Sequence, residues 1–164
     1  MKKILITLVV LLLGVSVFAS WSKNYYVDDF GDKTDIPYLT SEFINIKYGE
    51  YSWENESCRI LIDEDNVSFS IGKTYYDEWT LKTKNASGEI HNFRCKLSSS
   101  TGRLFINDYS SSGYKNTKVF LSDLLVGCRI VLTPNNQFAD DKFDFGTMSI
   151  TLEELRQVRP NWGK

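Results

Sequence analysis

Apolar and polar residues alternate with a period of two along most of this chain. The clearest case is residues 57–72, SCRILIDEDNVSFSIG, in which every second residue of each half is apolar. Successive side chains of a β-strand point to opposite faces of the sheet, so the pattern predicts two half-buried strands. Glu64, Asp65 and Asn66 separate the two halves and supply turn-forming residues, which predicts a β-hairpin.

The same alternation recurs in the remaining sequence, with turn-forming residues between the extended segments. Further strands are expected within residues 25–30, 39–48, 78–84, 89–98, 103–107, 128–133 and 142–150. Strands at intervals of about ten residues, separated by turns, are typical of β-sandwiches and barrels. We therefore predict a mainly β fold, an antiparallel β-sandwich of jelly-roll-like form.

Two segments depart from the strand pattern and predict helices. Residues 120–125 carry apolar side chains at helical spacing, and Gly127 is placed to end a short helix. Thr151 and Glu154 have the spacing of a capping box, which predicts a C-terminal helix that ends before Pro160.

The first residues have the composition of a secretory signal peptide. Lys2 and Lys3 are followed by a nearly continuous apolar run to Val17, and small residues stand at the positions expected for cleavage after Ala19. A membrane anchor is the alternative, but spanning a bilayer needs about 20 apolar residues and this run is shorter. We predict a signal peptide at 1–19, export to the periplasm or the exterior, and one domain at 20–164.

Charge and cysteine content limit the classes of partner and site. Without Lys2 and Lys3 the chain has seventeen basic and twenty-one acidic residues, a formal net charge of −4. The basic residues are scattered, so we expect neither nucleic-acid binding nor stable membrane insertion after signal removal. Cys58, Cys95 and Cys128 lack the close pairing of a zinc site, and we predict buried thiols with at most one disulfide.

Residues 25–35 read YYVDDFGDKTD and carry a family resemblance. This phrase, just after the expected signal peptide, resembles the opening of a group of uncharacterised secreted bacterial proteins, in which proline often stands where this chain has Lys33. The resemblance covers about a dozen residues and implies export, without implying an activity. The Asp-Asp-Phe strand is also similar, more weakly, to strands of jelly-roll carbohydrate-binding modules.

Catalytic chemistry has few candidate residues here. His91 is the only histidine, and the neighbouring candidate nucleophile on its strand face, Cys95, lies about 13 Å away along an extended strand. We therefore interpret His91 as a strand residue at the end of the sheet. Glycoside hydrolysis needs two carboxylates about 5–10 Å apart. Two acidic pairs have a suitable local spacing, although turn chemistry explains both of them: Glu54 with Glu56, and Asp63 with Asp65.

Four aspartates near the start of the domain are candidate calcium ligands, since calcium favours carboxylate-rich loops. They are Asp28, Asp29, Asp32 and Asp35. The spacing of an EF-hand is absent, and aspartate beside glycine is a common turn residue for local reasons. We predict turn chemistry here, and neither a metal nor a cofactor.

Aromatic residues in polar surroundings are the most suggestive feature. They are Tyr48, Tyr51, Trp53, Tyr75, Tyr76, Tyr109 and Tyr114. Aromatic rings suit sugar rings and protein partners alike, although rings that cap the ends of a sandwich would look the same. In the polar connection 107–116, Tyr109 and Tyr114 flank three serines and a glycine, a combination used in binding loops.

Two functional hypotheses follow from these residues. The leading one is a secreted, non-catalytic binding or interaction module for a glycan or a protein, with Tyr109 and Tyr114 as ligand-binding residues. The alternative is a carbohydrate-active hydrolase that uses two carboxylates. A cleft with two facing carboxylates would favour the hydrolase, whereas a flat or aromatic-lined end would favour the binding module.

Overall fold

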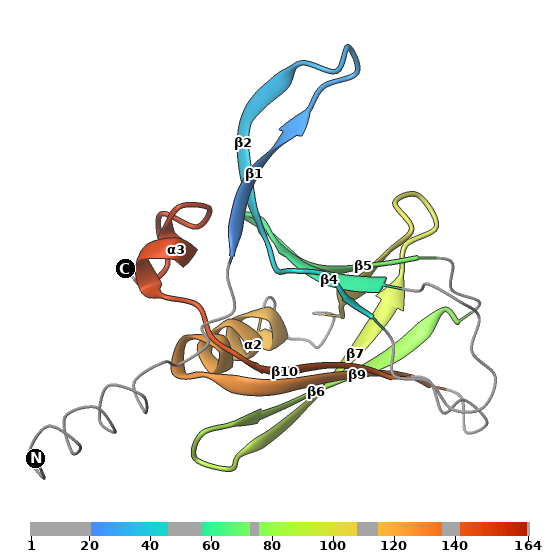
Figure 1. Cartoon of the computed structure of the whole chain (residues 1–164), viewed down its shortest axis with the longest axis vertical. Coiled ribbons are helices and arrows are strands. Elements are labelled where there is room, and N and C mark those ends of the chain that lie inside the picture. Colours follow the sequence, from blue (N-terminus) through green and yellow to red (C-terminus); the bar gives the residue numbers. More distant parts are fainter. Residues whose placement is uncertain (1–20, 46–56, 73–75, 108–114, 136–141, 164) are drawn as a thin grey trace, which may run out of the picture.

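The structure is a computed structural model that describes residues 21–45, 57–72, 76–107, 115–135 and 142–163 (Figure 1). The predicted signal peptide lies outside these ranges, and so does most of the polar connection 107–116. The description below concerns the five described segments.

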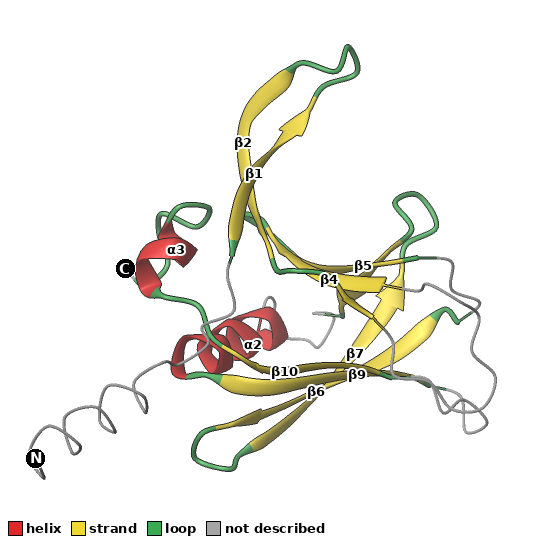
Figure 2. Ribbon diagram, viewed as in Figure 1, coloured by secondary structure: helices red, strands yellow, loops and turns green. Residues whose placement is uncertain are grey.

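Strands dominate the described chain, and all of them pair in antiparallel fashion (Figure 2). Their bounds are β1 Ser22–Val27, β2 Lys33–Thr40, β3 Ile44–Asn45, β4 Ser57–Ile62, β5 Val67–Ile71, β6 Glu78–Asn85, β7 Ile90–Leu97, β8 Arg103–Ile106, β9 Cys128–Pro134 and β10 Phe143–Met148. The order across the sheet is β1-β2-β4-β5-β8-β7-β6-β9-β10, and β3 pairs with β4. The hairpin predicted at 57–72 is β4–β5, with Cys58, Ile60 and Ile62 all buried.

One continuous sheet folds over on itself to make the two layers. Strands β5 and β10 are five steps apart in the sheet, which would separate them by about 24 Å if the sheet were flat. Yet the rings of Phe69 on β5 and Phe145 on β10 are only 6.2 Å apart. The sheet therefore encloses its core as a sandwich does, and the prediction of a mainly β, sandwich-like antiparallel fold is confirmed.

Helix α2, Lys115–Val126, supplies a third source of core side chains. Its Phe120 ring meets Phe69 on β5 and Phe93 on β7 edge-on, at centroid distances of 6.2 and 6.1 Å. Leu121 and Leu124 are also fully buried. Gly127 ends the helix with a φ of 84°, a conformation that other residues adopt at a cost, so the predicted stop is confirmed.

Helix α3, Leu152–Arg156, confirms the predicted C-terminal helix and its cap. The Thr151 hydroxyl accepts a hydrogen bond from the Glu154 amide, and the Glu154 carboxylate accepts one from the Thr151 amide. Leu155 is buried against the sheet. The indole of Trp21 donates to the Ser149 carbonyl at 2.8 Å, which holds the beginning of the domain beside the residues that precede α3.

The first strands differ from the sequence prediction. The prediction placed strands within 25–30 and 39–48 and none between them, whereas β2 already begins at Lys33 and ends at Thr40. Ser41 interrupts the strand because its hydroxyl accepts the Ile60 amide in place of a backbone carbonyl. Phe43, within the predicted segment 39–48, is largely exposed, and the Arg59 guanidinium lies 4.5 Å from the centre of its ring.

No helix in the described ranges combines the length and the apolar composition that crossing a bilayer requires.

Candidate functional site

The residues that the sequence singled out for binding fall mostly outside the described chain. Tyr109 and Tyr114 lie in the interval 108–114, and Tyr48, Tyr51, Trp53 and Tyr75 lie in two further intervals that are not described. Tyr76 is described, and its ring packs edge-on against Trp79 at 6.0 Å. The binding role of Tyr109 and Tyr114 therefore stays a prediction, and the candidate sites below are built from other residues.

The most distinctive surface feature is a two-stranded ribbon that projects from the sheet (Figure 1). Strand β2 pairs with β4 only through Leu39 and Thr40, while its pairing with β1 continues to Lys33. We call residues 24–38, which lie beyond the β4 ladder, the arm. In the described structure each strand of the arm is hydrogen-bonded to a neighbouring strand on one side only. Pro37 is tolerated in such an edge strand because proline has no backbone amide to donate.

The turn of the arm is organised by Asp28. Its carboxylate oxygen Oδ1 accepts hydrogen bonds from the amides of Phe30 and Asp32, each at 2.9 Å. Gly31 completes the turn with a φ of 86°. One of the four aspartates considered as calcium ligands, Asp28, thus accepts the hydrogen bonds of a turn. Among the described residues, no three His, Cys, Asp or Glu side chains lie close enough together to hold a metal ion.

The end of the arm exposes apolar side chains. Phe30, at the turn, is 91% exposed, and Val27 and Ile36 are 65% and 55% exposed. Four aspartates and one lysine give residues 24–38 a formal charge of −3. Isolated two-stranded hairpins are marginally stable in water. The arm therefore combines exposed apolar side chains with a net negative charge on a ribbon that has little support from the rest of the sheet.

The base of the arm is fixed by Asp63, in the turn between β4 and β5. Its Oδ2 accepts the Tyr26 hydroxyl at 2.9 Å, and its Oδ1 accepts the amides of Asp65 and Asn66. Burial and the neighbouring Asp63 carboxylate raise the pKa of Tyr26, so this phenol stays protonated as the donor. The Tyr26 ring also stacks on Tyr38 with centroids 4.7 Å apart. The arm is thus anchored at its root while its tip is bare.

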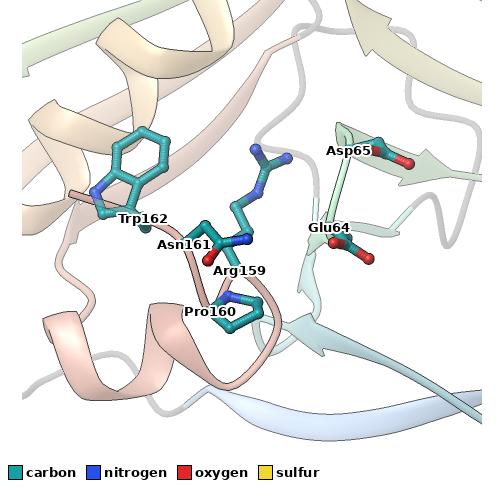
Figure 3. A pocket seen from close by; sticks show the side chains of 6 residues that line it. All are labelled: Glu64, Asp65, Arg159, Pro160, Asn161 and Trp162. Atoms are coloured by element: carbon teal, nitrogen blue, oxygen red, sulfur yellow. The ribbon is translucent and has the colours of Figure 1, made fainter. Parts of the chain in front are cut away.

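The same turn forms one wall of a pocket of about 260 Å³ (Figure 3). Its lining residues are Glu64, Asp65, Arg159, Pro160, Asn161 and Trp162. Arg159 crosses from the C-terminal segment and donates through Nε to the Asp63 carbonyl at 2.7 Å. The pocket is polar, and it lies where the β4–β5 turn meets the segment that follows α3.

Two carboxylates line this pocket, but they do not face each other across it. Glu64 and Asp65 are consecutive residues of one turn, and the opposite wall is made by the segment from Arg159 to Trp162. Figure 3 shows both carboxylates pointing away from Arg159. Glycoside hydrolysis needs an acid and a second carboxylate on two sides of the bond to be cleaved. This pocket therefore does not supply the two facing carboxylates that the hydrolase alternative requires.

A buried polar cluster joins helix α2 to strands β6 and β7. Asp123, only 4% exposed, accepts hydrogen bonds at Oδ2 from Thr83 at 2.5 Å and from His91 Nδ1 at 2.9 Å. His91 Nε2 lies 3.2 Å from Glu89. The hydrogen bond with Asp123 is the largest cause of a raised His91 pKa. His91 is indeed a strand residue, and both of its ring nitrogens face carboxylates, so no nucleophile stands at either.

All three cysteines are buried free thiols, as the sequence predicted for at least one of them. Burial raises the pKa of Cys95 and of Cys128 to about 12, and it raises the pKa of Cys58 further. A thiolate is the reactive form of cysteine, so these pKa values oppose nucleophilic or metal-binding roles.

Sequence reasoning missed the arm and the Asp123 cluster for different reasons. The arm segment was recognised as a strand and turn, but its projection depends on where β2 leaves β4. The separation of Asp123 from its partners, 32 residues to His91 and 40 to Thr83, leaves no local pattern. The local signal was an aspartate placed between the apolar residues Leu121 and Leu124 of the predicted helix.

No protein-family model, no curated protein and no solved structure matches this chain. The suspected relation to secreted proteins that open with a similar phrase stays a prediction.

Proposed function

We propose that this protein is an exported, non-catalytic interaction module whose arm inserts its tip into a protein partner. The observation that carries the proposal is the exposure of Phe30 at the end of a ribbon that is anchored at its base and otherwise solvated. Single exposed apolar residues are ordinary, but Val27, Phe30 and Ile36 are three exposed apolar side chains within one ribbon. Aromatic side chains that fill a pocket on a partner contribute much of the binding energy of protein interfaces.

The chemistry of the tip favours a protein over a glycan. Val27 and Ile36 carry no group that can hydrogen-bond to sugar hydroxyls, whereas aliphatic and aromatic side chains are what an apolar protein socket buries. The formal charge of −3 on the arm indicates a socket whose rim is basic, because opposite charges on two partners speed and orient association. The hydrolase alternative has no comparable support, since the pocket carboxylates share one turn.

A binding comparison with a matched control tests this proposal. Purified wild type, Phe30→Ala and Val126→Ala would each be screened with a displayed library of random peptides and with a glycan array. Val126 is 64% exposed at the end of α2, far along the chain from the arm, so its truncation removes similar apolar surface elsewhere.

We expect peptides that combine an apolar residue with Lys or Arg to be retained by wild type and Val126→Ala and lost by Phe30→Ala. Equal retention by all three proteins would contradict a role for the arm. If glycans bind in a Phe30-dependent manner and no such peptide binds, the partner is a sugar and the proposal of a protein partner is wrong.

A further inference from the structure

The described structure contains a surface that matches the arm tip in both charge and apolar character. It lies on the outer face of β6, β7 and β9 and consists of Lys82, Lys84, Ile90, Arg129 and Val131. We call it the basic face. Register places these residues together, because Ile90, Lys84 and Arg129 are successive cross-strand partners, and Lys82 is paired with Val131.

The basic face has two lysines on its central strand, β6, with an apolar residue on the strand at either side. Ile90 on β7 is 58% exposed, and Val131, on β9 at the other side of β6, is half-buried. Lys82 and Lys84 are exposed, and among the described residues neither forms an ion pair. Arg129 is neutralised by Asp144, with Nη2 and Oδ2 2.6 Å apart. The surplus charge of the face therefore comes from the two lysines.

We propose that the arm of one molecule docks on the basic face of a second copy of this chain. The inference rests on the proposed function, which makes the arm the contact element, and it names the partner. The complementarity has two parts, since the acidic arm meets the unpaired lysines while Phe30 covers the exposed Ile90. Complementary potentials of this kind orient association and exclude partners of like charge.

The positions of the two surfaces fix the form of the assembly. The arm projects from one side of the molecule, while β6 and β9 form the layer on the opposite side (Figure 1). An arm therefore cannot reach the basic face of its own chain, and a contact between two different surfaces is head-to-tail. Head-to-tail contacts produce rings or open chains rather than closed two-fold dimers.

Charge reversal gives a sharp test. Variant one carries Asp29→Lys and Asp35→Lys, which leave the Asp28 turn bonds intact. Variant two carries Lys82→Glu and Lys84→Glu. The control carries Lys118→Glu and Lys142→Glu, which reverse two other exposed lysines. Each purified protein would be studied by sedimentation velocity over a range of concentrations and salt.

We expect wild type and the control to form species larger than dimers as concentration rises, and to dissociate in high salt. Each charge-reversed variant should remain monomeric alone, because its arm and face then carry the same sign, and an equimolar mixture of the two should associate again. Phe30→Ala should weaken association by about thirtyfold, the loss typical of a central contact residue.

Failure here is distinguishable from failure of the proposed function. Monomeric wild type at every concentration would overturn self-association, and so would association that neither charge reversal nor Phe30→Ala alters. If wild type is monomeric while peptide binding still depends on Phe30, the arm keeps its role with another partner. If Phe30→Ala changes neither property and charge reversal leaves association unchanged, both proposals are wrong.

Discussion

Asp123 Oδ2 lies 2.9 Å from His91 Nδ1, and this contact joins helix α2 to strand β7. The same oxygen accepts the Thr83 hydroxyl, so one buried carboxylate satisfies donors from two strands. Burying a charge or a polar group without a partner is costly. Losing only the carboxylate, or only its donors, should therefore destabilise the fold more than losing both together.

Removing the carboxylate should therefore destabilise the fold. We expect Asp123→Ala to lower the free energy of unfolding by about 2–4 kcal/mol, since Thr83 would lose its acceptor inside the protein. Ser122→Ala, at an exposed neighbouring position, should change it by less than about 0.5 kcal/mol. Urea unfolding measures both. Combining Asp123→Ala with Thr83→Val should cost less than the sum of the two, and strict additivity would contradict the coupling.

His91 should make stability depend on pH in a defined direction. Its pKa is raised in the folded state, chiefly by the hydrogen bond with Asp123. Its stabilising contribution is then fully present below the unfolded pKa of about 6.5, and it is lost as pH rises through the folded pKa. The stability difference between wild type and His91→Gln should therefore be larger near pH 6 than near pH 9. A difference that is constant or grows with pH would show that the charge of His91 contributes nothing.

The hydrogen bonds of Asp63 at the base of the arm predict two variants that differ in how much stability they lose. Tyr26→Phe removes only the hydrogen bond to Asp63 and should cost about 0.5–1.5 kcal/mol of unfolding free energy. Asp63→Ala also removes the acceptor of the Asp65 and Asn66 amides, and should cost more, about 1–3 kcal/mol. Thermal or urea unfolding shows which of the two variants loses more stability. Equal, negligible effects would mean that the turn does not hold the arm.

The three thiols should be unreactive until the protein unfolds. Cys58, Cys95 and Cys128 are buried and have raised pKa values, which keep them protonated at pH 8. We expect a thiol-specific chromogenic reagent to label none of them rapidly in the native protein and all three in denaturant. Three thiols that react without denaturant would contradict their burial.

Local patterns allowed much of the fold to be predicted from the sequence. The cap formed by Thr151 and Glu154, the stop at Gly127 and the β4–β5 hairpin each depend on residues close together in the chain. Period-two alternation also predicted the antiparallel, sandwich-like class. It could not predict that one sheet bends until Phe69 meets Phe145, because that contact depends on the order of strands.

The candidate site was less predictable because exposure is a property of the assembled sheet. Phe30 lies at the turn of the arm, and it is exposed because β2 pairs with β4 only at Leu39 and Thr40, which leaves the preceding residues of β2 beyond the β4 ladder. The basic face likewise requires the register that places Lys84 beside Ile90 and Arg129. Scattered lysines in the sequence become a patch only after the strands pair.

Truncating the arm tip should separate binding from stability. Phe30→Ala should change the free energy of unfolding by less than about 0.5 kcal/mol, because the ring is 91% exposed. A loss of more than about 2 kcal/mol would mean that Phe30 is part of the core, since losses of that size follow from truncating buried side chains.

Photo-crosslinking from the arm tip tests its role as the contact element most directly. A photoreactive phenylalanine analogue would replace Phe30 in one protein and Val126 in another, and both would be irradiated in producing cells. We predict a protein adduct from position 30 and none from position 126. The same adducts from both positions, or none from position 30, would contradict the proposal that the arm binds a partner.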